Sequence, residues 1–163
     1  AANHNPLHYD RRPFPDRATT ATGWPIVPEG QHQLLVWLHR RYGGLPMYIT
    51  ENGVALPDDV DPDGRVRDPE RIAYLREHFE AARRAMDDGV DLRGYFVWSL
   101  LDNLEWSCGY AKRFGLVRCD FDNQARTIKD SGRWYADWIA RGGWKAAKPA
   151  ADQPAIQPAG ERG

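Results

Sequence analysis

The sequence has only two cysteines, Cys108 and Cys119, among its 163 residues. Two cysteines are too few for a disulfide framework, and neither a CxxC pair nor a cysteine–histidine cluster suggests a metal site. The five histidines are scattered, and no HExxH motif occurs. We therefore expect two free thiols, and in the absence of a secretory signature we expect a cytoplasmic protein.

Long apolar runs and a strong charge of one sign are also lacking. The formal net charge is −1, and no apolar run approaches the roughly 18 residues of a membrane span. Neither nucleic acid nor a membrane is therefore an expected partner. The N-terminus has no basic-then-apolar signal pattern and begins abruptly at Ala1, so we expect the true N-terminus to be absent.

What the sequence does contain is a short apolar stretch that ends in an acid. Residues 47–50 are typical of a buried strand, Glu51 follows directly, and Asn52-Gly53 is a turn signal. A strand that delivers an acid into a turn is how a (β/α) barrel places a catalytic group at its C-terminal face. Glu51 is therefore the leading candidate for chemistry.

The rest of the chain predicts alternating helices and strands. We expect helices at 31–41, from Pro69 to a stop at Gly89, and at 129–139, with a second buried strand at 94–99 and a hairpin-like excursion at 114–121. This order favours α/β architecture with parallel crossovers. Two parallel strands need neighbours on both sides, so we infer the end of a larger barrel, incomplete as an isolated chain.

Finer expectations follow from the same patterns. Residues 1–145 are assigned to the barrel portion, with a long loop over 1–29, and the Pro/Ala-rich residues 146–163 to a disordered tail. Asp68 is expected to cap the second helix, and Glu80 and Arg84 to pair on its solvated face. The core-facing stripe of the first helix is expected to comprise Leu34, Leu35, Trp37 and Leu38.

Several motifs resemble those of one family. Residues 48–53 (YITENG) and 94–106 (GYFVWSLLDNLEW) resemble the two signature stretches of glycoside hydrolase family 1, the β-glucosidase family. Further matches occur in the family's order and cover about 23–139; they are Gly23-Trp24, Arg71 with Tyr74, Leu75 and His78, Gly109-Tyr110, residues 112–116, and Arg126, Lys129 and Ser131. Each motif is weak alone, but together and in register they are specific.

The resemblance implies a (β/α)₈ TIM barrel, of which this chain would hold strands seven and eight. It also implies hydrolysis of β-glycosides with retention, and Glu51 matches the family's nucleophile. No metal or organic cofactor is implied, because two carboxylates suffice for this chemistry.

The resemblance also implies the sugar-binding residues. Trp98 matches the platform that stacks on the reacting ring, Glu105 and Trp106 match the pair that hydrogen-bonds the glycone hydroxyls, and Phe114 matches an aromatic lining of the same subsite. Asn52, Asp102 and Asn103 are expected to fix loops rather than touch substrate. The family further leads us to expect a cis Trp98–Ser99 peptide bond in the complete barrel.

The second carboxylate of the retaining pair has no counterpart here. The family carries its acid/base in an Asn-Glu-Pro motif, and this tripeptide does not occur in the sequence. We therefore expect the isolated chain to be inactive and its partners to be a β-glucoside or oligosaccharide and the missing N-terminal part of the barrel. Two alternatives stay open: a non-catalytic carbohydrate-binding fragment, or a partial reading frame without a stable fold. Glucosidase, galactosidase and fucosidase specificities also stay open.

Overall fold

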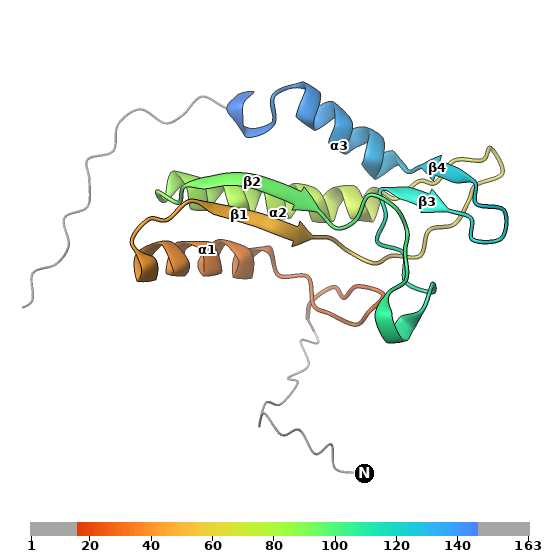
Figure 1. Cartoon of the computed structure of the whole chain (residues 1–163), viewed down its shortest axis with the longest axis horizontal. Helices are drawn as coiled ribbons and strands as arrows, with labels where there is room; N and C mark the ends of the chain where they lie inside the picture. Colours follow the sequence, from red (N-terminus) through yellow and green to blue (C-terminus); the bar gives the residue numbers. More distant parts are fainter. Residues whose placement is uncertain (1–15, 147–163) are drawn as a thin grey trace, which may run out of the picture.

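The computed structural model describes residues 16–146 (Figure 1). The expected tail at 146–163 and the first half of the expected N-terminal loop lie almost wholly outside these residues. The elements, in chain order, are α1 (Pro28–Tyr42), β1 (Met47–Asn52), α2 (Pro69–Asp87), β2 (Leu92–Val97), the 3₁₀ turn η1 (Trp106–Cys108), β3 (Val117–Cys119), β4 (Arg126–Ile128), α3 (Asp130–Ala140) and the 3₁₀ turn η2 (Gly143–Ala146).

Helix α1 begins three residues before the predicted start and ends one residue after the predicted end, and both ends have local causes. Pro28 occupies the first turn, where a missing N–H costs nothing. Gly43 adopts the left-handed conformation with φ 77° and donates its N–H to the carbonyl of His39. The expected apolar stripe is only partly right, because Leu34 and Trp37 are each 55% exposed. The buried residues are Leu35 and Val36, since α1 packs on α2.

Helix α2 lies at the centre of the core. Leu75, Phe79 and Ala82 are buried on one face, and their spacing of three or four residues is that of an amphipathic helix. Two expectations about its polar residues are wrong. Asp68 occupies the N-cap position of α2, but its side chain accepts no hydrogen bond from an N–H of that helix. It accepts hydrogen bonds from the backbone N–H and the hydroxyl of Ser131, in the first turn of α3, instead. Arg84 pairs across helices with Glu29 at 3.0 Å rather than with Glu80, because α1 lies alongside.

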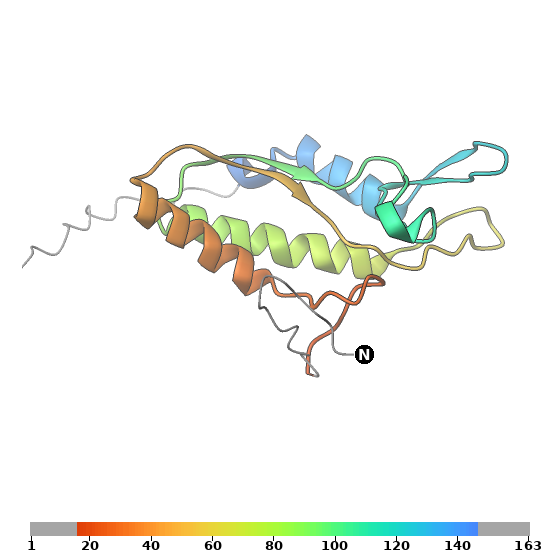
Figure 2. The same cartoon turned by 60° about the horizontal axis from the view of Figure 1, so that its bottom comes forward.

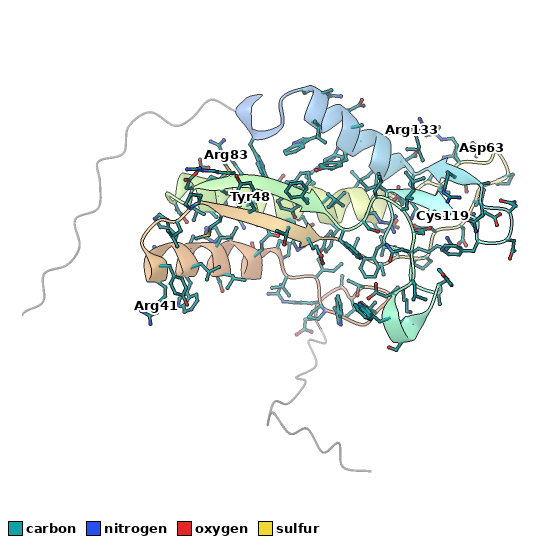
Figure 3. All side chains as sticks on the ribbon, in the orientation of Figure 1. Arg41, Tyr48, Asp63, Arg83, Cys119 and Arg133 are labelled. Atoms are coloured by element: carbon teal, nitrogen blue, oxygen red, sulfur yellow. The ribbon has the colours of Figure 1, made fainter. Side chains whose placement is uncertain are left out.

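Strands β1 and β2 form a parallel pair whose carboxyl ends meet at one edge (Figure 1). Helices α1 and α2 lie beneath one face of this pair, and α3 lies beyond β2 next to α2 (Figure 2). Met47 and Ile49 face the helices and pack on the core. Tyr48, 56% exposed, lies on the other face over the strand pair (Figure 3).

The strand pair has no further strand on either side within residues 16–146. This agrees with the inference that the sheet needs neighbours that the described residues do not supply. The second two-stranded sheet is the antiparallel hairpin of β3 and β4. It reaches Ile128 rather than ending near Phe121, because β4 returns along β3 before α3 begins. No helix of the described part is long and apolar enough to cross a membrane.

The aromatic core is built around Phe79. Its ring, 3% exposed, lies 4.7 Å from the ring centroid of Tyr95 and 4.5 Å from that of Trp138. Trp134, Tyr135 and Trp144 complete the set within 5.8 Å. Phe79 thus joins α2, β2 and α3, and the aromatic residues of α3 pack on the core.

We predict that Phe79→Ala lowers the free energy of unfolding by about 3–5 kcal/mol, because it leaves a cavity among five aromatic rings. Denaturant titration followed by circular dichroism measures the loss. Glu77→Ala on the exposed face of the same helix is the control and should change stability by less than about 0.5 kcal/mol. Equal effects of the two substitutions would contradict this account of the core.

Candidate active site

A bulge at the end of β1 sets the direction of Glu51. From Ile49 to Asn52 the strand advances three residues while its partner advances two, from Tyr95 to Val97. Thr50 and Glu51 are consequently both exposed, whereas regular alternation would expose only one of them. The strand also runs two residues further than predicted, so Glu51 is the second-to-last residue of β1 and does not follow the strand.

Asn52 is held on the helix side of the sheet. Its Oδ1 accepts a hydrogen bond of 2.6 Å from the Tyr95 hydroxyl, and its Nδ2 donates to the Tyr74 hydroxyl at 3.3 Å. Burial raises the pKa of both tyrosines, so both hydroxyls keep their protons. Asn52 therefore fixes the strand end, as expected, and leaves the adjacent Glu51 on the open face.

Gly53 brings the two strand ends into backbone contact. The Trp98 N–H donates to the Asn52 carbonyl at 2.9 Å. A Cβ atom on Gly53 would lie 1.7 Å from the Trp98 carbonyl oxygen, so only glycine fits there. Trp98 is 37% exposed, and its peptide bond to Ser99 is cis, as the resemblance predicted. The structure thus places Glu51 and Trp98 at neighbouring strand ends.

The loop after β2 presents the next two candidates. Glu105 donates its N–H to the Gly109 carbonyl at 2.7 Å, which closes a tight turn around η1. Trp106 has φ 42° and is 89% exposed, whereas Glu105 is half-buried. Phe114 is only 5% exposed and lies in the interior. Its contact with a sugar therefore stays a prediction, while the other candidates offer surface to a ligand.

Glu51 also lines a cleft of about 380 Å³ between β1 and the first helices. Trp24, Gln31, Tyr74 and His78 contribute to its walls. Burial lowers the pKa of His78 and keeps the imidazole neutral. Trp24 was not among the residues predicted for the site. Its place between Gly23 and Pro25, in the irregular segment before α1, could have suggested an exposed aromatic at this end of the cleft. Among the described residues, no group of three or more His, Cys, Asp or Glu side chains is placed to hold a metal ion.

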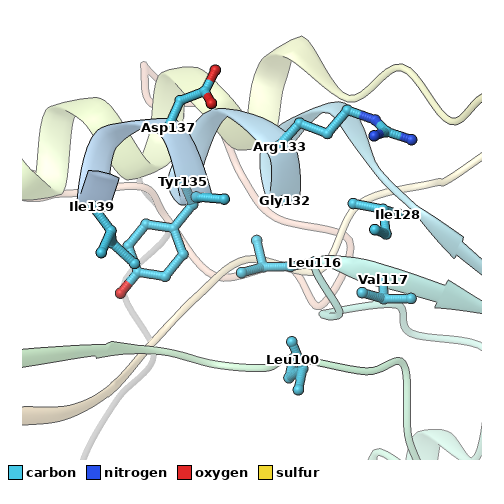
Figure 4. A pocket seen from close by; sticks show the side chains of 10 residues that line it. Leu100, Leu116, Val117, Ile128, Gly132, Arg133, Tyr135, Asp137 and Ile139 are labelled. Atoms are coloured by element: carbon cyan, nitrogen blue, oxygen red, sulfur yellow. The ribbon is translucent and has the colours of Figure 1, made fainter. Parts of the chain in front are cut away.

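A separate apolar cavity of about 710 Å³ lies between α3 and the β3–β4 hairpin (Figure 4). Leu100, Leu116 and Tyr135 point into it from three different segments. None of the five candidate residues lines it. This cavity therefore does not belong to the candidate site. Cys108 and Cys119 are both free thiols, as expected.

The class follows from the parallel strands, which present the carboxylate of Glu51 and the exposed Trp98 at one edge. This is an α/β protein with a candidate site at the carboxyl ends of its strands. The family follows from comparison with known proteins. Residues 3–144 match the model of glycosyl hydrolase family 1. The chain belongs to this family.

Curated relatives and solved structures agree. The chain is 54% identical to the 1,4-beta-D-glucan glucohydrolase of Thermotoga neapolitana over 124 residues, which are 76% of this chain and 28% of that protein. It is 51% identical to beta-glucosidase A of Thermotoga maritima over 78% of this chain and 29% of that protein. The structure of a family 1 β-glucosidase from Thermotoga maritima matches with a TM-score of 0.77 and 49% identity, covering 83% of this chain and 30% of that one. These β-glucosidases are TIM barrels, and the chain spans less than a third of their length.

We predict that Gly53→Ala disturbs the site and costs about 1–3 kcal/mol of stability, because the new methyl group overlaps the Trp98 carbonyl oxygen. Thermal unfolding measures the stability, and tryptophan fluorescence reports any shift of Trp98.

The matched control is Gly30→Ala in α1. Its Cβ would meet only Val27, at an ordinary 3.6 Å, and alanine suits a helix better than glycine. This variant should be neutral or slightly more stable. A Gly53→Ala variant as stable as Gly30→Ala would refute the close approach of the two strand ends.

Proposed function

We propose that the chain is the nucleophile-bearing and sugar-binding part of a retaining β-glycoside hydrolase of the β-glucosidase type, which cleaves terminal non-reducing β-D-glucosyl residues by double displacement. The observation that carries this proposal is the exposed carboxylate of Glu51 at the carboxyl end of β1, beside Trp98. In a TIM barrel, catalytic groups sit at this end of the strands. The proposed position within the barrel is strands seven and eight.

Each candidate residue has a separate task. Glu51 attacks the anomeric carbon, forms a glycosyl–enzyme intermediate and departs when water attacks the same carbon. Trp98 offers its indole face to the C–H groups of the reacting ring. On the loop after β2, the Glu105 carboxylate accepts hydrogen bonds from glycone hydroxyls, and the Trp106 indole N–H donates one. Phe114 is assigned to the lining of the same subsite.

Double displacement requires a second carboxylate. In retaining enzymes the two carboxyl groups are about 5–5.5 Å apart, so that one can protonate the departing oxygen while the other attacks. The sequence has no Asn-Glu-Pro tripeptide to supply that acid. We therefore propose that the acid/base comes from the part of the barrel that this chain does not cover, and that the chain alone does not turn over substrate.

The names of the relatives support the substrate class. Besides the glucosidases from Thermotoga, a 50% identical relative from Bifidobacterium breve is named a bifunctional beta-D-glucosidase/beta-D-fucosidase, and a 45% identical one from Clostridium acetobutylicum a 6-phospho-beta-galactosidase. All of these names describe the removal of a β-linked sugar. A solved structure of the Thermotoga maritima β-glucosidase contains glucoimidazole.

The test joins this chain to the part of Thermotoga maritima beta-glucosidase A that it does not cover. We predict that the joined barrel hydrolyses an aryl β-glucoside, and that Glu51→Gln lowers kcat at least about a thousandfold because the amide cannot act as the nucleophile. Glu77→Gln on the exposed face of α2 is the control and should leave kcat unchanged.

A β-glucosyl fluoride that carries fluorine at C2 gives a second readout. Its leaving group needs no protonation, so it should label the joined barrel at Glu51, as peptide mass spectrometry would show. Labelling elsewhere would reject the assigned nucleophile. Turnover by the chain alone, abolished by Glu51→Gln, would show that it holds both carboxylates.

Sugar binding without catalysis is the second candidate, favoured by the 89% exposure of Trp106. An indole that open can contact a sugar before any barrel is completed. On this reading, titration of the chain with cellobiose changes its tryptophan fluorescence, and Trp106→Ala abolishes the change. Trp37→Ala, 55% exposed on α1, is the control. An unchanged response in Trp106→Ala would exclude Trp106 as the binding residue.

A further inference from the structure

A group of buried charges lies beyond the carboxyl ends of β1 and β2. Its acids are Asp58, Asp68 and Asp102, and its bases are Arg71, Arg113 and Lys129, so the charges balance. The side chains are at most 1% exposed, except for Arg113 at 20%. None of the six has been given a part in the proposed chemistry.

Lys129 joins the two loops that leave the strand ends. Its ammonium group donates to Asp102 at 2.9 Å and also contacts Asp58. Asp58 belongs to the loop that follows Glu51, and Asp102 to the loop that leads to Glu105 and Trp106. Lys129 itself, just before α3, is fully buried. Among the described residues it is the one side chain that forms salt bridges with both loops.

The Asp102 carboxylate organises the second loop. It accepts hydrogen bonds from the Gly115 N–H at 2.9 Å and the Cys119 N–H at 3.3 Å, and pairs with Arg113 at 2.7 Å. Burial alone would raise its pKa, but Lys129 and Arg113 outweigh burial and lower it, so the group stays ionised. Gly115 approaches so closely that a Cβ atom would lie 2.3 Å from the Asp102 nitrogen.

Arg71 anchors the first loop in the same way. Its guanidinium donates to both oxygens of Asp58, at 2.9 and 3.1 Å. It also donates to the carbonyls of Val54 and Arg113 at 3.4 and 3.0 Å. Val54 follows Gly53 directly, so the anchor lies three residues from Glu51.

Buried ion pairs are a poor source of stability, because apolar side chains of similar volume often do as well. Fixed charges instead supply directional contacts, since every carboxylate oxygen of Asp58, Asp68 and Asp102 has a defined donor. We propose that Lys129 is a positioning residue: through Asp58 and Asp102 it fixes the loop after Glu51 relative to the loop that carries Glu105 and Trp106. The consequence for catalysis rests on the proposed function, but the coupling of the loops does not.

Hydrogen exchange of the full chain, followed by mass spectrometry, tests the coupling. Reporter amides exist in both loops. The Leu56 N–H of the first loop donates to the carbonyl of Arg113, which lies after η1, and the Glu105 N–H of the second loop donates to the Gly109 carbonyl. We expect Asp58→Asn to speed exchange about tenfold in residues 54–58 alone, and Asp102→Asn in residues 99–109 alone. Lys129→Met should speed exchange in both segments, with residues 75–85 of α2 changed by less than about twofold.

The control is Arg67→Gln, which removes a surface pairing with Asp61 and Asp63 and should leave both segments unchanged. A uniform rise that includes α2 in all three variants would mean that the charges only stabilise the fold, and would overturn the proposal. Exchange in one segment alone for Lys129→Met would overturn it as well. The experiment needs no sugar, so a failure of the proposed function would appear only in the hydrolysis assay.

Discussion

The parallel pairing of β1 with β2 is the constraint on which the candidate site depends. Because both strands run the same way, Glu51 and Trp98 reach one edge although 46 residues lie between them in the chain. The hydrogen bond from the Trp98 N–H to the Asn52 carbonyl then fixes their spacing along the strands. Helix α2 makes the crossover possible by covering the face that the strands would otherwise expose.

Two kinds of interior meet along α2. The aromatic cluster around Phe79 fills the space between β2 and α3. The charged group around Arg71 instead lies between the start of α2 and the loops that follow β1 and β2. Apolar packing tolerates an exchange of side chains when the volume is kept, whereas charged groups in a dry interior tolerate few alternative partners. The protein therefore places its most directional contacts near the residues proposed to meet the sugar.

Much of this arrangement is predictable from the sequence, because the informative signals are local. Pro69 and Gly43 mark helix ends by their own backbone preferences, and the apolar runs around Ile49 and Tyr95 predict the two strands. The strands are not buried on both faces as expected, because Tyr48 and Phe96 are more than half exposed within the described residues. The motifs around Glu51 and Trp98 identify the family, which the comparisons confirm.

The errors arise where a partner distant in sequence decides the outcome. Asp68 has the right type and place for a helix cap, but Ser131 and Arg71 bind its carboxylate. Leu34 and Trp37 fit an apolar stripe, yet neighbours cover only one flank of α1. The bulge before Asn52 is also invisible locally, because it depends on the register with β2. Phe114 matches an aromatic lining of the sugar subsite by its motif, yet its side chain is buried in the interior and only 5% exposed.

The bulge before Asn52 also makes the direction of Glu51 depend on the number of residues in β1. The extra residue between Ile49 and Asn52 allows Glu51 to face outward while Asn52 faces the tyrosines. Loss of Thr50, or insertion of one residue beside it, would make the count from Ile49 to Asn52 even, restore regular alternation and leave both residues on their present faces. The present count of three is odd, so regular alternation without the bulge would turn Glu51 toward the helices and Asn52 away from them. The side of the sheet that carries the carboxylate is thus set by a residue count together with the register to β2, and not by the identity of one side chain.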